Sequence, residues 1–145
     1  MYYVNREQIE RRLALLPEVT EVLKASGSTV EQSLLERYAE ERALHLAVEI
    51  VTDVGSYLID GFIMRDASSY EDIIDIIFDE KVITSELHLT FTELVRLRKP
   101  LVQDYFAWDR HELHQLTKRL PDALNTFAGS VLLYLDREGI TEGRR

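Results

Sequence analysis

The sequence contains no cysteine, 6 glycines and 3 prolines among its 145 residues. Without cysteine there is no disulfide framework and no thiolate metal site, and such a composition fits a reducing cytosol. So little glycine and proline argues against a loop-rich β-sandwich and favours long helices. Apolar residues make up 46% of the chain, enough for a hydrophobic core, and the length is that of one domain, residues 1–145.

Positive charge is also scarce, because 17 lysines and arginines stand against 26 aspartates and glutamates, a net charge of −9. An acidic chain repels nucleic acid at long range, which argues against a DNA-binding protein that works through a basic patch. An enzyme that meets RNA through a few local cations remains compatible with this balance.

Long apolar runs free of charge are absent as well. The most apolar stretch, residues 43–64, has the length of a membrane span but contains His45, Glu49, Asp53 and Asp60. Each of these side chains is costly in lipid, so we interpret the stretch as a buried core helix and expect no membrane partner. The N-terminus also lacks the basic region and apolar run of a secretory signal, so we expect a cytoplasmic protein.

Apolar residues instead recur at helical spacing along most of the chain. The pattern predicts an all-α bundle of four long helices and one short helix. The long helices are expected over about residues 5–25, 30–63, 84 to beyond 98, and 109–138, the short one over 70–80, with a frayed tail over about 139–145.

Capping residues and prolines mark the ends and breaks of these helices. The expected N-terminal caps are Asn5 with Gln8, Thr29 with Gln32, Ser68 with Glu71, Thr84 or Ser85, and Asp109 with Glu112. Pro17 is expected to bend or divide the first helix, and Pro100 to kink or break the fourth. Gly139 is a natural stop for the last helix.

A polar row borders the apolar stripe of the longest helix, formed by Arg42, Glu49, Asp53 and Asp60. The stripe offers more apolar surface than a small bundle covers, and the row could pair with itself across a two-fold axis, so we expect a homodimer. His45, Glu49 and Asp53 share one helix face and could form a metal-ligand set. We interpret them as a polar seam paired with a cation, and predict no metal.

The stretch with the most promising chemistry is Arg98-Lys99-Pro100-Leu101-Val102-Gln103-Asp104-Tyr105. Helical spacing places Arg98 and Tyr105 on the apolar stripe of the fourth helix. A buried arginine is costly unless paired, so Arg98 is expected to face a carboxylate, a cleft or a second chain. Glu49 or Asp53 could be that carboxylate, in a bidentate contact.

Two histidines and an aromatic cluster follow the motif. His111 and His114 could bind a metal or relay protons, but we interpret them as a solvated first helical turn. The cluster of Tyr105, Phe106 and Trp108 could be core, a base-stacking surface or a protein interface, and we favour core or subunit interface.

The stretch 98–105 resembles the signature of the HepT-like family, the toxin half of HepT–MntA toxin–antitoxin pairs. That signature is an arginine, four to six residues, a histidine, one residue and a tyrosine. Further segments are similar to the YutE-type branch of the family, at residues 53–55, 60–66, 69–76 and 79–83. The likeness extends over roughly residues 5–138.

The resemblance implies a helical bundle that dimerises and places the motif near the dimer cleft. It also implies RNA cleavage, in which Arg98 would stabilise the charge of the transition state. The implied partner is a minimal nucleotidyltransferase antitoxin, which would silence the toxin by adding AMP to Tyr105. No cofactor is expected.

Gln103 stands where the signature has its histidine, and Lys99 and Pro100 also depart from the usual pattern. Metal-free RNA cleavage needs groups that accept and return a proton, whereas a glutamine amide can only orient through hydrogen bonds. Loss of that step costs about two to four orders of magnitude in rate. We therefore hypothesise a weak or inactive ribonuclease, in which Asp104 could act as a base if its pKa were raised.

Two other readings of the chain remain open. It could be a non-catalytic helical subunit that presents a site to a nucleotidyltransferase, or a purely structural dimer. Toxicity on expression that depends on Arg98 would favour catalysis, and AMP on Tyr105 would favour a regulated toxin.

Overall fold

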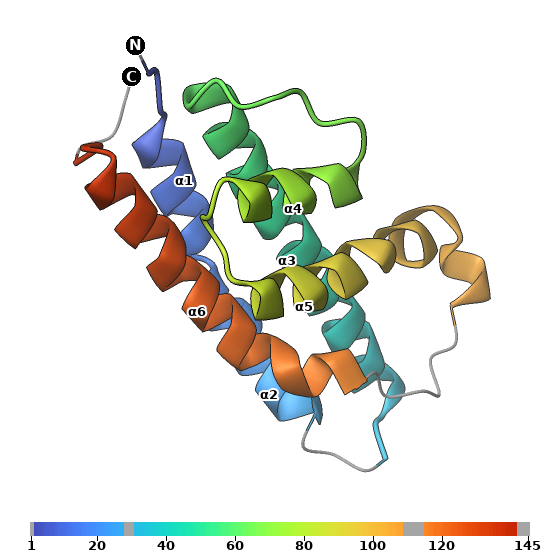
Figure 1. Ribbon diagram of the computed structural model, residues 1–145. Helices are drawn as coiled ribbons and strands as arrows, with labels where there is room; N and C mark the ends of the chain where they lie inside the picture. Colours follow the sequence, from blue (N-terminus) through green and yellow to red (C-terminus); the bar gives the residue numbers. More distant parts are fainter. Residues whose placement is uncertain (1, 28–30, 109–114, 142–145) are drawn as a thin grey trace.

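The computed structural model describes residues 2–27, 31–108 and 115–141, and within these segments every regular element is helical (Figure 1). The elements are α1 (Arg6–Leu13), α2 (Leu16–Gly27), α3 (Leu34–Gly61), α4 (Tyr70–Asp79), α5 (Ser85–Arg96), the π-helical turn η1 (Lys99–Gln103), the 3-10 turn η2 (Tyr105–Ala107) and α6 (Gln115–Arg137). The all-α class predicted from the sequence is confirmed for the described part of the chain.

The longest helix, α3, lies at the centre of the arrangement (Figure 1). Helices α1, α2, α4 and α5 all contact it, and α6 packs against α2 and α5. The break between α1 and α2 comes just before Pro17, which suits the first turn of a helix. If α1 and α2 are taken as two halves of one divided helix, the elements are the expected four long helices and the short α4.

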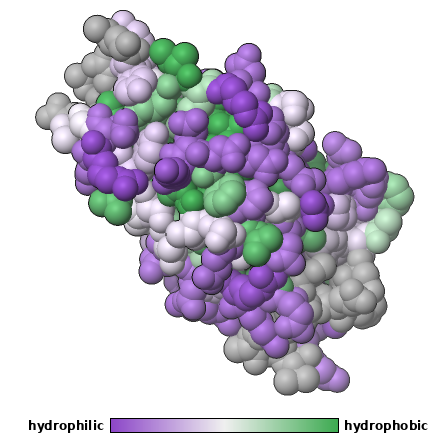
Figure 2. Space-filling model, in the orientation of Figure 1, coloured by the Kyte–Doolittle hydropathy of each residue, from purple (hydrophilic) through white to green (hydrophobic). Residues whose placement is uncertain are grey.

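Most of the buried apolar residues form one large cluster, to which each of the helices α1 to α6 contributes, and Ile59, Ile73 and Ile76 form a smaller second cluster between α3 and α4. Phe91 of α5 meets Phe127 of α6 edge to face, with ring centroids 5.2 Å apart, and both rings are fully buried. The apolar stripe predicted for α3 is buried at six positions, whereas Ala39 is exposed and Leu46 is only partly buried. The six are Ala43, Ala47, Ile50, Val51, Val54 and Leu58. The face turned to the viewer in Figure 2 is mostly hydrophilic, with apolar side chains in separate spots.

Two helices begin later than the capping pattern predicts. Ser33 caps α3: its hydroxyl accepts a hydrogen bond from the Glu36 amide at 3.1 Å, and Glu36 Oε1 accepts one from the Ser33 amide at 2.9 Å. The cap of α4 is Ser69 and not the predicted Ser68, because the Ser69 hydroxyl accepts a hydrogen bond from the Asp72 amide at 3.0 Å. Serines and threonines cluster before both helices, and the pattern does not show which of them takes the extended conformation that a cap requires.

The last helix ends in a Schellman motif at Gly139, whose φ is +81°. The Gly139 amide donates to Asp136 O at 3.1 Å, and the Ile140 amide donates to Leu135 O at 2.8 Å. Arg6 of α1 also donates a hydrogen bond to the Ile140 carbonyl. The backbone of residues 139 and 140 is therefore hydrogen-bonded to the last turn of α6 and to α1, and the frayed tail expected from about residue 139 stays a prediction.

Within the described segments, no helix is long and apolar enough to cross a membrane.

Candidate functional site

The helix that carries the motif changes form at Pro100. The Leu101 amide still bonds to Leu97 O at 2.9 Å, whereas the Asp104 amide bonds to Lys99 O, five residues back, also at 2.9 Å. Because Pro100 has no N–H to donate, the α-helical ladder cannot continue through it. The predicted break is confirmed, and it takes the form of a widened, π-helical turn.

The widened turn brings Arg98 and Gln103 to one place. Residues five apart lie above one another in a π-helical turn, so these two side chains reach the same side of the chain. They share a groove of about 380 Å³ lined by Ser69, Tyr70, Glu71, Val95, Arg96, Arg98, Lys99 and Gln103. The groove thus joins the motif to the first turn of α4.

The Arg98 guanidinium lies between a carboxylate and an aromatic ring. Its Nε is 4.0 Å from Glu49 Oε2, and its Cζ is 4.3 Å from the centroid of the Tyr70 ring. The buried Nε makes no hydrogen bond within the described residues. Glu49 is therefore one of the two predicted carboxylate partners, but the expected bidentate contact is wrong, because the 4.0 Å between Arg98 Nε and Glu49 Oε2 is too long for a hydrogen bond. His45 Nε2 also lies 3.6 Å from Glu49 Oε1.

Asp53, the other candidate partner, does not approach Arg98. Its Oδ2 lies 3.1 Å from Arg12 Nε of α1, and the Arg12 guanidinium also covers the Tyr57 ring at 4.9 Å. Asp53 thus ties α1 to α3. Within the described residues, no group of three or more histidine, aspartate or glutamate side chains could hold a metal ion.

Tyr105 lies on the surface and not on the buried stripe, which corrects the sequence prediction. The tyrosine is 59% exposed in η2, and its ring meets that of Phe106, which is 79% exposed, edge to face at 5.9 Å. The α-helical phase that would have buried Tyr105 is lost at the π-helical turn. Of the aromatic cluster, only Trp108 packs against the core.

The remaining candidates fall into two groups. Asp104 Oδ2 lies 3.9 Å from Lys99 Nζ, and this is the ion pair that it makes within the described residues. His111 and His114 lie outside the described residues.

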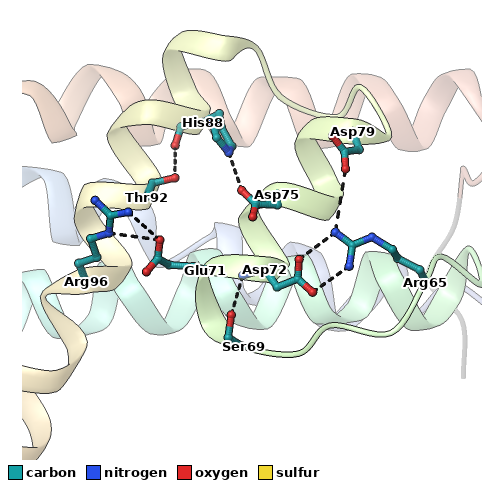
Figure 3. Close-up of polar contacts among 9 residues, drawn as sticks. All are labelled: Arg65, Ser69, Glu71, Asp72, Asp75, Asp79, His88, Thr92 and Arg96. Carbon is teal, nitrogen blue, oxygen red and sulfur yellow. Dashed lines mark hydrogen bonds and ion pairs between the residues drawn. The ribbon is translucent and has the colours of Figure 1, made fainter.

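Helix α4, which begins at Tyr70, is fixed by ion pairs (Figure 3). Arg65 donates to both oxygens of Asp72, each at 2.8 Å, and the Ser68 amide donates to Asp72 Oδ2 at 2.9 Å. The hydrogen bonds from Arg65 and Ser68 hold the pKa of the Asp72 carboxyl well below its usual range. The loop before α4 is thereby fastened to the first turn of that helix.

Two further pairs join α4 to α5 (Figure 3). Arg96 donates to Glu71 Oε1 at 2.9 and 3.2 Å, and His88 Nε2 lies 2.7 Å from Asp75 Oδ1. Sequence reasoning missed both, since the partners are 25 and 13 residues apart and form no local pattern. The sequence hints at these ion pairs only through a row of carboxylates along α4, which would need positively charged partners on a neighbouring helix.

Comparison with known proteins gives one family and a near relative. The family model described as "Ribonuclease HepT-like" matches residues 9–131. YutE of Bacillus subtilis (strain 168) is 39% identical over 138 residues, which cover 95% of this chain and 94% of YutE. The solved structure of YutE, described as a cytosolic protein of unknown function, matches with a TM-score of 0.86 at 38% identity, over 99% of each chain.

Two toxin–antitoxin structures share the fold at lower identity. The tri-AMPylated HEPN toxin of Shewanella oneidensis in complex with its MNT antitoxin matches with a TM-score of 0.72 at 16% identity, over 86% of this chain and 96% of the toxin. A mutant of an MntA toxin–antitoxin pair matches equally, with a TM-score of 0.72 at 16% identity, over 86% and 97% of the two chains. At such identity the likeness shows the fold alone.

Proposed function

The chain belongs to the ribonuclease HepT-like family, and on that premise we propose that it is the toxin component of a toxin–antitoxin pair, built on an RNA-cleaving fold whose catalysis is weak or lost. The observation that carries the proposal is the groove in which Arg98 and Gln103 lie together. A positioned arginine and a side chain that cannot transfer a proton are what an impaired ribonuclease site would contain.

The two motif residues would have unequal parts in the reaction. Arg98 stabilises negative charge on the phosphoryl group in the transition state, since a guanidinium presents fixed hydrogen-bond donors to phosphate oxygens. Gln103 lines the groove and can orient a 2′-hydroxyl by a hydrogen bond, but its amide has no useful pKa. The missing proton transfer lowers the rate by about two to four orders of magnitude.

Tyr105 is proposed as the acceptor of AMP from a nucleotidyltransferase antitoxin. Its side chain is 59% exposed, so a partner enzyme can reach it. The toxin of similar fold from Shewanella oneidensis is described as tri-AMPylated and bound to its MNT antitoxin, which supports this kind of partner. The cytosol is the proposed location, as for YutE.

A homodimer is proposed as the working form. Leu34 and Leu35 at the start of α3 are 61% and 81% exposed, which leaves apolar surface for a second copy to cover. Of the polar row on α3, Arg42 and Asp60 are exposed, whereas Glu49 and Asp53 already face arginines of the same chain. Sedimentation that shows only monomer at micromolar concentration would contradict the dimer.

The test of catalysis is Gln103→His, expressed without any partner, with growth and RNA integrity followed together. Because histidine restores a proton-transfer group, RNA cleavage is expected to rise by about two to four orders of magnitude. Arg98→Ala in the same background is the matched control and should abolish the gain. Wild-type cleavage as fast as that of the histidine variant would show that catalysis is not impaired.

A second candidate function is a non-catalytic subunit that presents Tyr105 to a nucleotidyltransferase. The exposure of Tyr105 and the glutamine at position 103 favour it. Co-expression with the partner should then add the mass of AMP to the wild type but not to Tyr105→Phe. If the wild type receives AMP on Tyr105 and the Gln103→His variant still cleaves no RNA, the chain is a presenting subunit and not a toxin.

A further inference from the structure

The Arg98 guanidinium lies over an aromatic face in the groove. Its Cζ lies 4.3 Å from the Tyr70 ring centroid, well within the range of about 6 Å over which a cation is attracted to a ring. The 4.0 Å separation of Arg98 Nε from Glu49 Oε2 is too long for a hydrogen bond. Glu49 therefore supplies charge balance, and the ring supplies the geometric restraint.

The Tyr70 ring is itself held in place. Tyr70 is the first residue of α4, directly after the cap residue Ser69. Its neighbour Glu71 binds Arg96, two residues before Arg98, at 2.9 Å. Helix α4, which carries the ring, is thus joined to the last residue of α5, two residues before Arg98, so the ring and the guanidinium meet in a preorganised geometry.

The burial of Arg98 shows what this geometry leaves free. Its side chain is 22% exposed and its Nε is buried, yet the residue lines the groove. With one face covered by Tyr70, the exposed part of the planar fork is directed to the groove. A guanidinium fixed in this way is suited to bidentate contact with a phosphate.

We propose that Tyr70 is the positioning residue for Arg98, and that it fixes the guanidinium plane so that the fork meets a phosphate of single-stranded RNA in the groove. The choice of RNA rests on the proposed function of the chain. The fixed guanidinium plane rests on the contact alone. The two parts can therefore be tested separately.

The first measurement uses no RNA. In wild-type protein the Arg98 Hδ and Hε resonances should lie upfield of those of the exposed Arg11, because the ring current of Tyr70 shields them. Tyr70→Leu should abolish the displacement and Tyr70→Phe should keep it, since phenylalanine retains the ring face. No displacement in the wild type, or one that persists in Tyr70→Leu, would overturn the positioning.

A matched control removes a tyrosine elsewhere. The Tyr3 amide bonds to Gly61 O, twelve residues along α3 from Glu49, which is about 18 Å at 1.5 Å per helical residue. Tyr3→Leu should leave the Arg98 resonances in place. Because Tyr70 is 43% exposed, its leucine variant should keep the wild-type far-ultraviolet circular dichroism spectrum.

The second measurement reads binding of a 2′-O-methyl RNA decamer, which cannot be cleaved through the 2′-hydroxyl. Tyr70→Leu should weaken its affinity roughly threefold to tenfold, and Tyr70→Phe should restore it to within about twofold of the wild type. Equal affinity of wild type and Tyr70→Leu, with the resonance displacement lost, would overturn the presentation of the fork to phosphate. Equal affinity of wild type and Arg98→Ala would contradict RNA binding at this groove and leave the resonance test to decide the positioning.

The same substitutions in the Gln103→His background give a catalytic readout. If that variant cleaves RNA, Tyr70→Leu should lower its rate at saturating RNA and Tyr70→Phe should rescue it. A purely structural role for the ring would lower stability in both variants without this rescue pattern. Equal rates for the leucine and phenylalanine variants would therefore count against Tyr70 as a positioning residue.

Discussion

Gly55 of α3 lies directly against Ile73 of α4, so closely that a Cβ atom on Gly55 would fall 2.4 Å from Ile73 Cγ2. Both residues are buried. The contact sets how near α4 can lie to α3, and α4 carries Tyr70 at its start. The absence of a side chain at position 55 therefore helps to place α4, and with it Tyr70, close to α3.

Gly55→Ala is expected to lower the free energy of unfolding by about 1–3 kcal/mol, because a buried methyl group must push a β-branched side chain that is stiff at χ1. Gly129→Ala is the matched control: Gly129 lies on α6 with nothing within 4 Å of an added Cβ. That change should raise stability by about 0.5–1 kcal/mol through helix propensity. Urea unfolding measures the free energy of unfolding of both variants. Equal values for Gly55→Ala and Gly129→Ala would show that α4 adapts to the added methyl group.

Two residues without glycine's freedom adopt left-handed backbone conformations after helices. Ile63 follows α3 with φ +56°, and Lys81 follows α4 with φ +64°. Glycine at either position should raise the free energy of unfolding by about 1 kcal/mol, with the larger gain at the β-branched Ile63, which is 71% exposed and has little burial to lose. Thermal unfolding measures the gain. A lower melting temperature for Ile63→Gly would mean that its side chain stabilises the loop more than its backbone strains it.

The fold was largely predictable because its information is local. Helix α4 was expected over residues 70–80 and spans Tyr70–Asp79, and the break at Pro100 was expected from the missing N–H. The form of that break could not be predicted, since a kink and a π-helical turn satisfy the same local rule. The phase of everything after Pro100 depends on that choice, and this is why Tyr105 was placed wrongly on a buried stripe.

The candidate site was predictable only in part because its contacts are distant in sequence. Glu49 and Asp53 were both predicted as possible partners of Arg98, because a buried arginine requires a carboxylate nearby, and the structure places Glu49 there. Tyr70 was not, since no spacing rule relates the first turn of α4 to the end of α5. His88, which stacks on Phe78 with ring centroids 4.6 Å apart, also has no local signature.

Asp72 should make stability depend on pH in the acid range. Its folded pKa is depressed by Arg65, below the unfolded value of about 3.9. The stabilisation is therefore fully present above the unfolded pKa and is lost as pH falls through the folded pKa. Asp72→Asn is expected to be less stable than wild type at pH 7, and the difference should shrink progressively below about pH 4.

The control for Asp72 is Asp79→Asn, since Asp79 lies 4.0 Å from the same arginine and is 63% exposed. The free energy of unfolding of Asp79→Asn at pH 7 should fall less than that of Asp72→Asn, because the 4.0 Å separation is too long for a hydrogen bond. Chemical unfolding at several pH values measures both variants. A constant difference between wild type and Asp72→Asn from pH 7 to pH 2 would show that the Arg65 contact does not stabilise the ionised carboxylate.

Arg6 joins the two ends of the described chain. The residue is 9% exposed, with its Nε 3.1 Å from Glu10 Oε2 and its Nη1 2.8 Å from Asp136 Oδ1, and it also donates to the Ile140 carbonyl. Arg6→Ala removes all three contacts. Glu10 and Asp136 are 50% and 59% exposed, so water can replace the arginine on both carboxylates. The expected loss is therefore about 1–3 kcal/mol, less than for a charge left buried without a partner.

Arg11→Ala is the matched control for this tie, because Arg11 lies on the same helix but is exposed, and its removal should change stability by less than about 0.5 kcal/mol. The loss of stability in Arg6→Lys should lie between those of Arg6→Ala and Arg11→Ala, since lysine keeps the positive charge but cannot make several directed hydrogen bonds at once, as a guanidinium does. Hydrogen exchange gives a local readout: in Arg6→Ala the Ile140 amide should exchange faster, because the carbonyl beside it loses its donor. If neither the exchange rate of the Ile140 amide nor the free energy of unfolding changes in Arg6→Ala, the Schellman motif alone fixes the end of α6 and Arg6 does not stabilise it.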